Sequence, residues 1–276
     1  MRAVKAILSR NLTNFVRDRM RFFFTIFMSV FFLFIFSFVM KTAAVGIENP
    51  MNYLISGIII MTIFQASMNN SMGILEDISI GYMKEILVAP IARWEISIGQ
   101  ILSATVLSIL QGMIVLVMGL FMGLQLDVLH FAEMMGIMVL VGVTFSSIGL
   151  YLATLSRNST TFQLVITIVT MPLTFLSGAY IPTTVMPAFL KPIMYLNPLT
   201  YTTAAFRFIA LKMEGLPTAA LIKAGVAFDI SGVVISPYAG LFLILAIGIV
   251  FFALCVNRFS KADFSTTKSF HGHRPG

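Results

Sequence analysis

The amino-acid sequence predicts an all-α polytopic membrane protein with six transmembrane helices. Hydrophobic residues make up 58% of its 276 residues, and its mean hydropathy is +0.96, whereas soluble domains are only about 45–50% apolar. The 26 Phe and 19 Met lie mostly in uninterrupted apolar runs, and about 20 such residues cross the hydrocarbon core of a bilayer. We therefore expect six spans, with an amphipathic helix before them, a cytoplasmic helix between the second and third, and two short re-entrant external helices before the last.

Residues 1–21 are expected to form a cytoplasmic amphipathic helix. On a helical wheel, Ile7 and Phe15 fall on its apolar half, and Arg10 and Arg17 fall on its basic half. A basic helix of this kind lies along the membrane surface, with its apolar half at the headgroup boundary. The arginines also provide the positive flank that orients the first span. Two explanations of their presence stay open, namely contact with lipid headgroups and contact with another part of the protein.

Six apolar runs without Asp, Glu, Lys, Arg or His follow as the predicted spans, and they define a transmembrane domain at 22–256. They cover residues 22–40, 53–73, 96–123, 134–155, 160–180 and 237–256. Pro172 lies inside the fifth run, where a proline is expected to kink the helix. The remaining residues, 257–276, are expected to form a basic, polar cytoplasmic tail.

The link between the second and third runs is rich in charge, although the chain as a whole is only 11% charged. Apolar residues recur there at every fourth position, namely Ile74, Ile78, Tyr82 and Ile86. This spacing predicts an amphipathic helix over about 75–89, which Pro90 ends. A solvated loop is the simpler interpretation, but mixed charge on a short helix favours a docking surface for another subunit.

The segment before the last run is expected to hold two short external helices, at about 183–212. Three prolines break up its first half. Asn197 then caps a second helix with Pro198 at its first position, because Asn accepts hydrogen bonds from free backbone N–H groups and Pro lacks such a group. Neither helix is long enough to span a bilayer, so we expect both to dip into the outer leaflet and return.

The distribution of Lys and Arg predicts the orientation of the chain. Of 18 such residues, 13 lie in the amino-terminal helix, the charged link, the turn at Arg157 and the tail. Positive residues favour the cytoplasmic side, so both termini and the charged link are expected to be cytoplasmic, in a prokaryotic cell membrane. Anionic membrane lipids then account for the net charge of +7, and a nucleic acid partner is not expected.

The sequence lacks the residues that several other classes of membrane protein need. The six runs hold no ionisable side chain, whereas ion-driven carriers usually keep one at membrane depth; passive flow through a channel or carrier without ATP stays open. A membrane enzyme is disfavoured, because no nucleophile–base pair or metal-binding helix motif occurs. No Gly precedes a Lys, so the chain has no phosphate-binding loop for ATP. We expect no catalysis, cofactor or metal in this chain.

Three features of the sequence resemble the membrane subunit of ATP-binding-cassette type-2 exporters, over nearly the whole chain. One is the order of the expected helices. The second is the stretch from Met83 to Pro90 followed by Gly99, which is similar to the family's segment between the second and third spans. The third is Leu-Ser-Gly-Ala-Tyr-Ile-Pro at 176–182 followed by Leu-Asn-Pro-Leu-Thr-Tyr at 196–201 and then Arg207. The stretch 213–236 is longer than the family's pattern leads us to expect.

The resemblance implies a permease that a separate ATPase drives. Two copies of this subunit, or this subunit and a related permease, would pair around a central path, and cytoplasmic ATP-binding-cassette subunits, which bind ATP and Mg²⁺, would dock below. Glu85 would lie in the coupling helix that these subunits push. The other residues implied at this contact are Glu76, Asp77, Tyr82, Lys84, Ile86 and Arg93, with Arg10, Arg17 and Asp18 meeting them from the surface helix.

The expected cargo is a hydrophobic or amphiphilic molecule, drug-like or lipid-like, moved out of the cytoplasm or the inner leaflet. Polar residues on the apolar runs are the candidate path residues, namely Gln65, Asn69, Thr167, Thr170 and Thr174. Such groups often bond their own or neighbouring helices instead. A gate is expected where the fifth span bends below the external helices, at Pro172, Ser177, Gly178, Asn197 and Pro198. Export of a lipid-linked polysaccharide, or of sodium, stays open within the same family.

Overall fold

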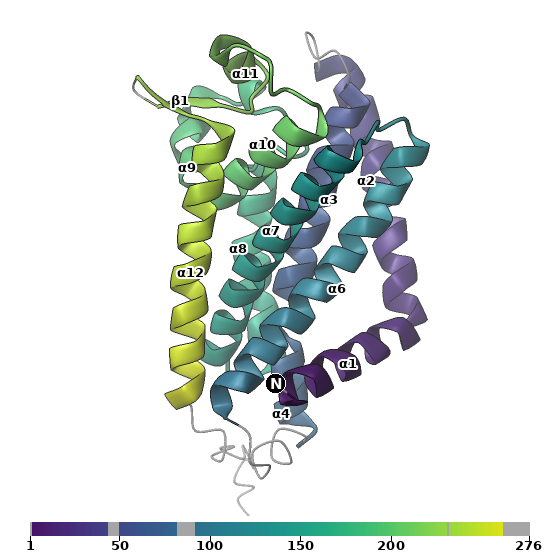
Figure 1. Ribbon diagram of the computed structural model, residues 1–276, viewed down its shortest axis with the longest axis vertical. Helices are drawn as coiled ribbons and strands as arrows, with labels where there is room; N and C mark the ends of the chain where they lie inside the picture. The colour runs from purple at the N-terminus through teal and green to yellow at the C-terminus, as the bar shows by residue number, and fades with distance from the viewer. Residues whose placement is uncertain (1, 44–49, 82–91, 231, 262–276) are drawn as a thin grey trace, which may run out of the picture.

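The computed structural model describes residues 2–43, 50–81, 92–230 and 232–261, which form an elongated helical bundle (Figure 1). The helices are α1 Arg2–Arg17, α2 Arg19–Ala43, α3 Pro50–Asn70, α4 Gly73–Ser79, α6 Arg93–Phe121, α7 Val128–Leu155, α8 Ser159–Phe175, α9 Lys191–Leu196, α10 Pro198–Ala210, α11 Thr218–Lys223 and α12 Pro237–Lys261, with single 3₁₀ turns η1 Thr183–Val185 and η2 Ala188–Leu190. We call the end of the bundle that holds α4 the α4 end, and the opposite end, where α11 lies, the α11 end (Figure 1).

Helix α3 is the centre of the bundle. In the run Pro50–Ser79, 78% of the most apolar window is buried inside the protein, against 22% for the corresponding window of α12. Helix α3 contacts α2, α6, α7, α8 and α10. A helix with apolar residues on all sides and no charged residue, such as α3, is compatible with such a central place.

Glycines let neighbouring segments approach α3 closely. A Cβ atom on Gly112 of α6 would lie 2.5 Å from Cγ1 of Ile63. A Cβ atom on Gly57 of α3 would lie 2.3 Å from the backbone oxygen of Ala179. Small residues at helix contacts are typical of membrane bundles, in which helices associate through close van der Waals packing.

Four described helical segments are long and apolar enough to cross a membrane. They are Pro50–Ser79, Arg93–Phe121, Val128–Leu155 and Pro237–Arg258. The described apolar segments Phe23–Phe36 and Ser159–Phe175 are shorter. The chain is a multi-pass membrane protein, and its crossing the membrane six times stays a prediction.

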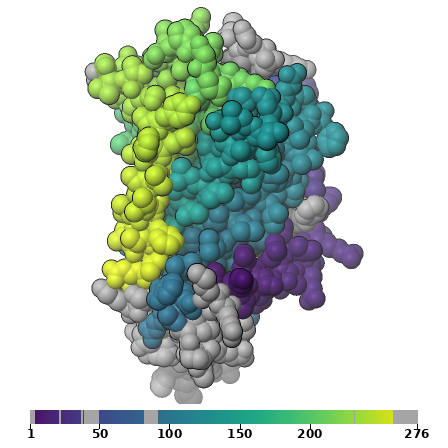
Figure 2. All heavy atoms as spheres, in the orientation of Figure 1, coloured from purple at the N-terminus to yellow at the C-terminus, as the bar shows by residue number. Residues whose placement is uncertain are grey.

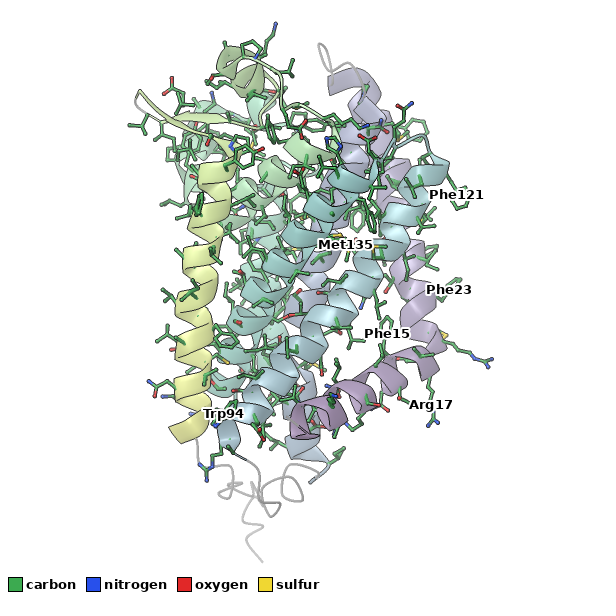
Figure 3. The ribbon with its side chains drawn as sticks, viewed as in Figure 1. Phe15, Arg17, Phe23, Trp94, Phe121 and Met135 are labelled. Carbon is green, nitrogen blue, oxygen red and sulfur yellow. The ribbon has the colours of Figure 1, made fainter. Side chains whose placement is uncertain are left out.

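The amphipathic helix α1 lies against α6. Ile7 and Phe15 are buried, and Phe15 points from α1 toward α6 whereas Arg17 points away (Figure 3). A Cβ atom on Gly99 of α6 would lie 3.0 Å from Cδ1 of Ile7, so the glycine lets the two helices meet. In the space-filling view, α1 projects from the side of the bundle near the α4 end (Figure 2).

The helix expected over 75–89 is not one continuous helix. Helix α4 ends at Ser79, and Gly81 has φ +82°, a conformation that interrupts a right-handed helix and that glycine adopts without strain. Residues 82–91, which hold the rest of the expected helix, lie outside the described residues.

The fold is mostly helical, as expected of an all-α membrane protein, but the stretch 213–236, for which the sequence led to no structural prediction, contains a short β-hairpin. Its strands β1 Phe228–Ile230 and β2 Val233–Ile235 pair antiparallel, with Asp229 opposite Val234. Helix α12 also continues to Lys261, so the first residues of the predicted tail at 257–276 are helical. The hydropathy pattern placed the long helices well but gave no account of this short paired segment.

We predict that Gly57→Ala destabilises the protein by about 1–3 kcal/mol, because the new methyl group overlaps a backbone oxygen that a side-chain rotation cannot move. Gly136→Ala is the matched control. Gly136 also lies within a helix, but a Cβ atom there has nothing within 4 Å, and alanine suits a helix better than glycine does. Thermal unfolding in detergent measures both variants, and equal melting temperatures would contradict the close approach of α3 to Ala179.

Candidate functional site

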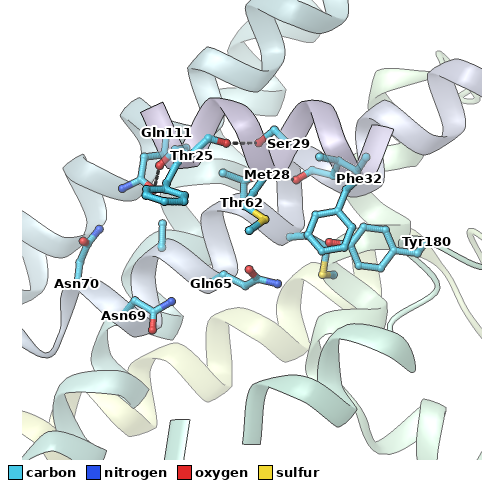
Figure 4. A pocket seen from close by; sticks show the side chains of 14 residues that line it. Thr25, Met28, Ser29, Phe32, Thr62, Gln65, Asn69, Asn70, Gln111 and Tyr180 are labelled. Carbon is cyan, nitrogen blue, oxygen red and sulfur yellow. Dashed lines mark hydrogen bonds between the residues drawn. The ribbon is translucent and has the colours of Figure 1, made fainter. Parts of the chain in front are cut away.

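A cavity of about 400 Å³ lies between α2 and α3 (Figure 4). The lining residues on each helix are spaced mostly three and four positions apart, so each helix contributes one face. From α2 these are Phe24, Thr25, Met28, Ser29 and Phe32, and from α3 they are Ile58, Met61, Thr62, Gln65, Ala66, Asn69 and Asn70. Gln111 of α6 and Tyr180, which follows α8, complete the lining.

The polar side chains of this pocket are amides and hydroxyls. Gln65 and Asn69 lie one helical turn apart on the α3 wall (Figure 4). On the opposite wall, Thr25 Oγ1 donates to Oε1 of Gln111 at 3.3 Å, which links α2 to α6. Nε2 of Gln111 is buried and has no hydrogen-bond partner in the described part of the chain. An unsatisfied buried donor costs about 1–3 kcal/mol, so a bound acceptor would be favoured here.

The pocket is uncharged and becomes aromatic toward the α11 end. None of the described residues that line it is Asp, Glu, Lys, Arg or His. The ring of Tyr180 stacks on those of Phe32 and Phe36, with ring centroids 5.2 and 4.5 Å away. A localised charge without a counter-charge is costly to remove from water. The pocket therefore suits a ligand that has both apolar surface and neutral hydrogen-bonding groups.

Two of the five residues expected along a transport path line this pocket, and three do not. Gln65 and Asn69 lie in it. Thr167 is exposed on α8, and its hydroxyl donates to the backbone oxygen of Gln163 at 2.8 Å. Thr170 is half-buried and Thr174 is buried, and neither is among the residues that line the pocket. A path role for the α8 threonines stays a prediction. Thr25 and Gln111, which the sequence analysis passed over, could have been found as isolated polar residues in apolar runs.

The residues expected at a gate lie together where α8 ends. The last carbonyl groups of a helix have no partner within it. Here Nδ2 of Asn197 donates to the oxygen of Leu173 at 2.8 Å, and Oγ of Ser177 donates to that of Thr174 at 2.7 Å. Pro172 lies inside α8, three residues before its last residue. The end of α8 is thus held partly by a side chain from the start of α10.

Helix α10 begins as the sequence predicts. Oδ1 of Asn197 accepts a hydrogen bond from the backbone N–H of Leu199 at 2.9 Å, and Pro198 is the first residue of the helix. Every residue from Leu199 to Ala210 is buried. The helix therefore lies inside the protein, with its amino-terminal end against the end of α8.

Arg207 of α10 is a buried cation that the sequence analysis quoted but gave no role. It is 1% exposed, and its guanidinium carbon lies 3.3 Å from the ring centroid of Tyr53. Its Nη2 donates to the backbone oxygens of Tyr53, Gly178 and Ala179 at 3.3, 3.2 and 3.4 Å. The carbonyl groups and the aromatic face solvate the charge in place of water. Arg207 thereby ties α10 to the start of α3 and to the turn that leads to Tyr180.

A second polar cluster lies at the α4 end, where α1, α4 and α6 meet. Nη2 of Arg10 donates to Oδ2 of Asp77 at 2.7 Å, and Nε2 of Gln100 donates to the same oxygen at 3.2 Å. Nδ2 of Asn11 donates to Oε1 of Gln100 at 3.2 Å. The side chain of Asp77 is 7% exposed, and hydrogen bonds to a charged group of this kind are among the stronger ones. Asn11 and Gln100 were not predicted, since the spacing along the sequence did not place them beside Asp77.

The residues expected to couple to an ATPase differ in their exposure to solvent. Asp77 is buried, and its carboxylate accepts a hydrogen bond from Arg10 of α1. Glu76 and Arg93 are exposed. Arg17 and Asp18, at the end of α1 and just beyond it, are also exposed. The remaining residues of this set lie outside the described residues, namely Tyr82, Lys84, Glu85 and Ile86.

These features define a helical, multi-pass membrane protein with an uncharged pocket between α2 and α3. The sequence profile of the ABC-2 type transporter family matches residues 2–211. The chain belongs to this family, which confirms the resemblance seen in its motifs.

Named relatives of the chain are transport permeases. It is 32% identical over 168 residues to the "Putative transport permease ycf38" of Cyanophora paradoxa, covering 59% of this chain and 57% of that one. It is 29% identical over 135 residues to the "Inner membrane transport permease YadH" of Escherichia coli strain K12, covering 49% and 52%. It is 28% identical over 142 residues to the "Probable multidrug ABC transporter permease YbhR" of the same strain, covering 49% and 37%. The matches therefore span little more than half of these relatives at most.

We predict that Arg10 and Asp77 are coupled in stability by about 1–3 kcal/mol. A double-mutant cycle with Arg10→Ala, Asp77→Ala and the double variant, measured by unfolding in detergent micelles, gives this energy. Arg17→Ala is the control, because Arg17 is on the same helix but exposed, and its cycle with Asp77→Ala should give a value near zero. A coupling energy for Arg10 and Asp77 as small as that of the control would contradict the contact.

Proposed function

We propose that this chain is the permease subunit of an exporter that moves a neutral or weakly polar amphiphile, drug-like or lipid-like, out of the cytoplasm or the inner leaflet. The observation that carries the proposal is the uncharged pocket between α2 and α3, in a chain of the ABC-2 type transporter family. The name of one relative, a probable multidrug permease, is consistent with this cargo.

The size and lining of the pocket favour this cargo over the alternatives. A volume of about 400 Å³ is in the range of sites for drug-sized ligands, roughly 300–1,000 Å³, and holds only a small part of a polysaccharide. A sodium ion is best bound by a tight cage of oxygens, whereas half of the side chains that line this pocket are apolar or aromatic. A diffuse organic cation is compatible with the pocket, because its charge can lie against the aromatic rings.

The energy for transport is proposed to come from a separate ATP-binding-cassette ATPase that binds ATP and Mg²⁺. The α4 end, with α1, α4 and the start of α6, is the proposed docking side and would face the cytoplasm, as would both termini. The chain is proposed to cross the membrane six times and to pair with a second copy or a related permease. A pair of permeases would place two such pockets in one transporter.

The proposal is tested by reconstituting the protein with its partner ATPase in liposomes. Association of the two proteins and ATP hydrolysis stimulated by lipophilic dyes are the expected results. Association without any stimulation by dyes or by short-chain phospholipids would contradict the cargo class. Failure of the two proteins to associate would contradict the proposed division of labour.

We predict that Glu85→Ala abolishes most substrate-stimulated ATP hydrolysis while the folded protein and its melting temperature are retained. The reason is that Glu85 matches the family segment on which the ATPase is expected to push. Asp263→Ala is the control, since it removes an acidic residue of the tail, on the same proposed side of the membrane. Unchanged stimulation in Glu85→Ala would remove this assignment.

We predict that Gln65→Leu and Asn69→Leu each raise the half-saturating dye concentration about three- to tenfold. This is the effect of losing about one hydrogen bond, roughly 1 kcal/mol. Thr167→Val is the control, because Thr167 is exposed on α8 and bonds its own helix. If the control changed transport and the two pocket variants did not, the path would lie along α8 and not in this pocket.

A further inference from the structure

A cluster of ionisable side chains lies at the α11 end, outside the pocket and the α4-end contact. His130 and Glu133 come from the first turns of α7, and Glu214 comes from the segment after α10. One ligand atom from each of these three residues lies within 4.8 Å of the others. The spacing His-x-x-Glu puts both α7 residues on one face of the helix.

The end of α10 fixes the position of Glu214. The backbone N–H of Met213 donates to the oxygen of Phe208 and that of Lys212 to the oxygen of Ile209, both at 3.0 Å. This is the hydrogen-bond pattern of a Schellman motif. Lys212, not a glycine, occupies its left-handed position, with φ +53°. The ammonium group of Lys212 bonds Asp127, the residue before α7, although lysine adopts this left-handed conformation reluctantly.

The hydrogen bonds of His130 leave one ring nitrogen facing a second carboxylate. Its Nδ1 lies 3.0 Å from Oδ2 of Asp127, and its Nε2 lies 3.4 Å from Oε1 of Glu214. If Nδ1–H donates to Asp127, the neutral ring presents a lone pair at Nε2 to the lone pairs of Glu214. That arrangement is repulsive unless the ring is also protonated at Nε2 or a metal cation lies between the two atoms. The three carboxylates around the ring also outnumber the one ammonium group, that of Lys212.

The distances match those of a first-row divalent cation. Zinc binds histidine nitrogen and carboxylate oxygen at about 2.0–2.2 Å, so two ligands of one tetrahedral ion lie about 3.4 Å apart. This is the separation of Nε2 of His130 and Oε1 of Glu214. Glu133 is exposed and its side chain is free to rotate toward them. A carboxylate that accepts from the other nitrogen of a metal-binding histidine, as Asp127 does here, is a common arrangement at zinc sites.

We propose that His130, Glu133 and Glu214 bind a divalent transition-metal ion such as Zn²⁺, and that Asp127 orients His130 for it. Water would complete the coordination, because Glu133 and Glu214 are exposed. The bound ion would join the start of α7 to the segment after α10, two parts of the chain otherwise linked at this place by Lys212 and Asp127. The site does not depend on the proposed transport function.

The experiment uses the full chain with His271→Ala and His273→Ala in every variant, purified without a histidine tag. His130 is then the only histidine, since the sequence has three. Isothermal titration with Zn²⁺ and the visible absorption of bound Co²⁺ report binding. We expect one equivalent per chain, an affinity at least tenfold lower in His130→Gln and in Glu214→Gln, and a weaker loss in Asp127→Asn.

Thermal unfolding separates binding from damage to the fold. Zn²⁺ should raise the melting temperature of the parent protein but not that of Glu214→Gln, while the two have similar melting temperatures without metal. Glu76→Gln, which changes an exposed carboxylate at the other end of the molecule, should bind like the parent. The absence of saturable binding at one equivalent, or binding that survives both His130→Gln and Glu214→Gln, would overturn the proposal.

Discussion

The backbone carbonyl groups between Leu173 and Ala179 need hydrogen-bond donors inside the fold, and much of the structure depends on how α10 supplies them. An unpaired carbonyl group in apolar surroundings costs several kcal/mol. Asn197 supplies one donor at the start of α10, and Arg207 supplies donors near its end. Helix α10 is short and would be marginally stable in isolation. Its hydrogen bonds to the carbonyl groups at and after the end of α8 help to hold it in place.

The same turn forms the aromatic end of the pocket. Gly178 and Ala179 accept from Arg207, and the next residue, Tyr180, stacks on Phe32 and Phe36 of α2. Helix α10 and the pocket are therefore joined through a few residues. The role of this region as a gate stays a prediction.

The sequence predicted those structural features that are set by residues close together in the chain, such as helix positions and helix caps. The apolar runs gave the ends of the long helices to within about six residues, and the Asn197–Pro198 pair gave the start of α10, because capping is local. The partners of Asp77 and the carbonyl groups around Arg207 come from distant parts of the chain, so spacing could not reveal them. On α8, which is apolar on most sides, nothing in the sequence says which face meets α3, and the threonines chosen there fell outside the pocket. The β-hairpin was missed because three-residue strands are too short for an alternating pattern to be recognised.

The placement of α2 has a consequence for how a cargo molecule would reach the pocket. Helix α2 contacts mainly α3, and its outer face exposes Phe23, Phe27 and Phe34. If this face of α2 meets lipid in the proposed transporter, α2 would be the helix that separates the lipid from the pocket. A solute already dissolved in the bilayer would need to displace only that one helix, and it would not have to return to water before entering the protein.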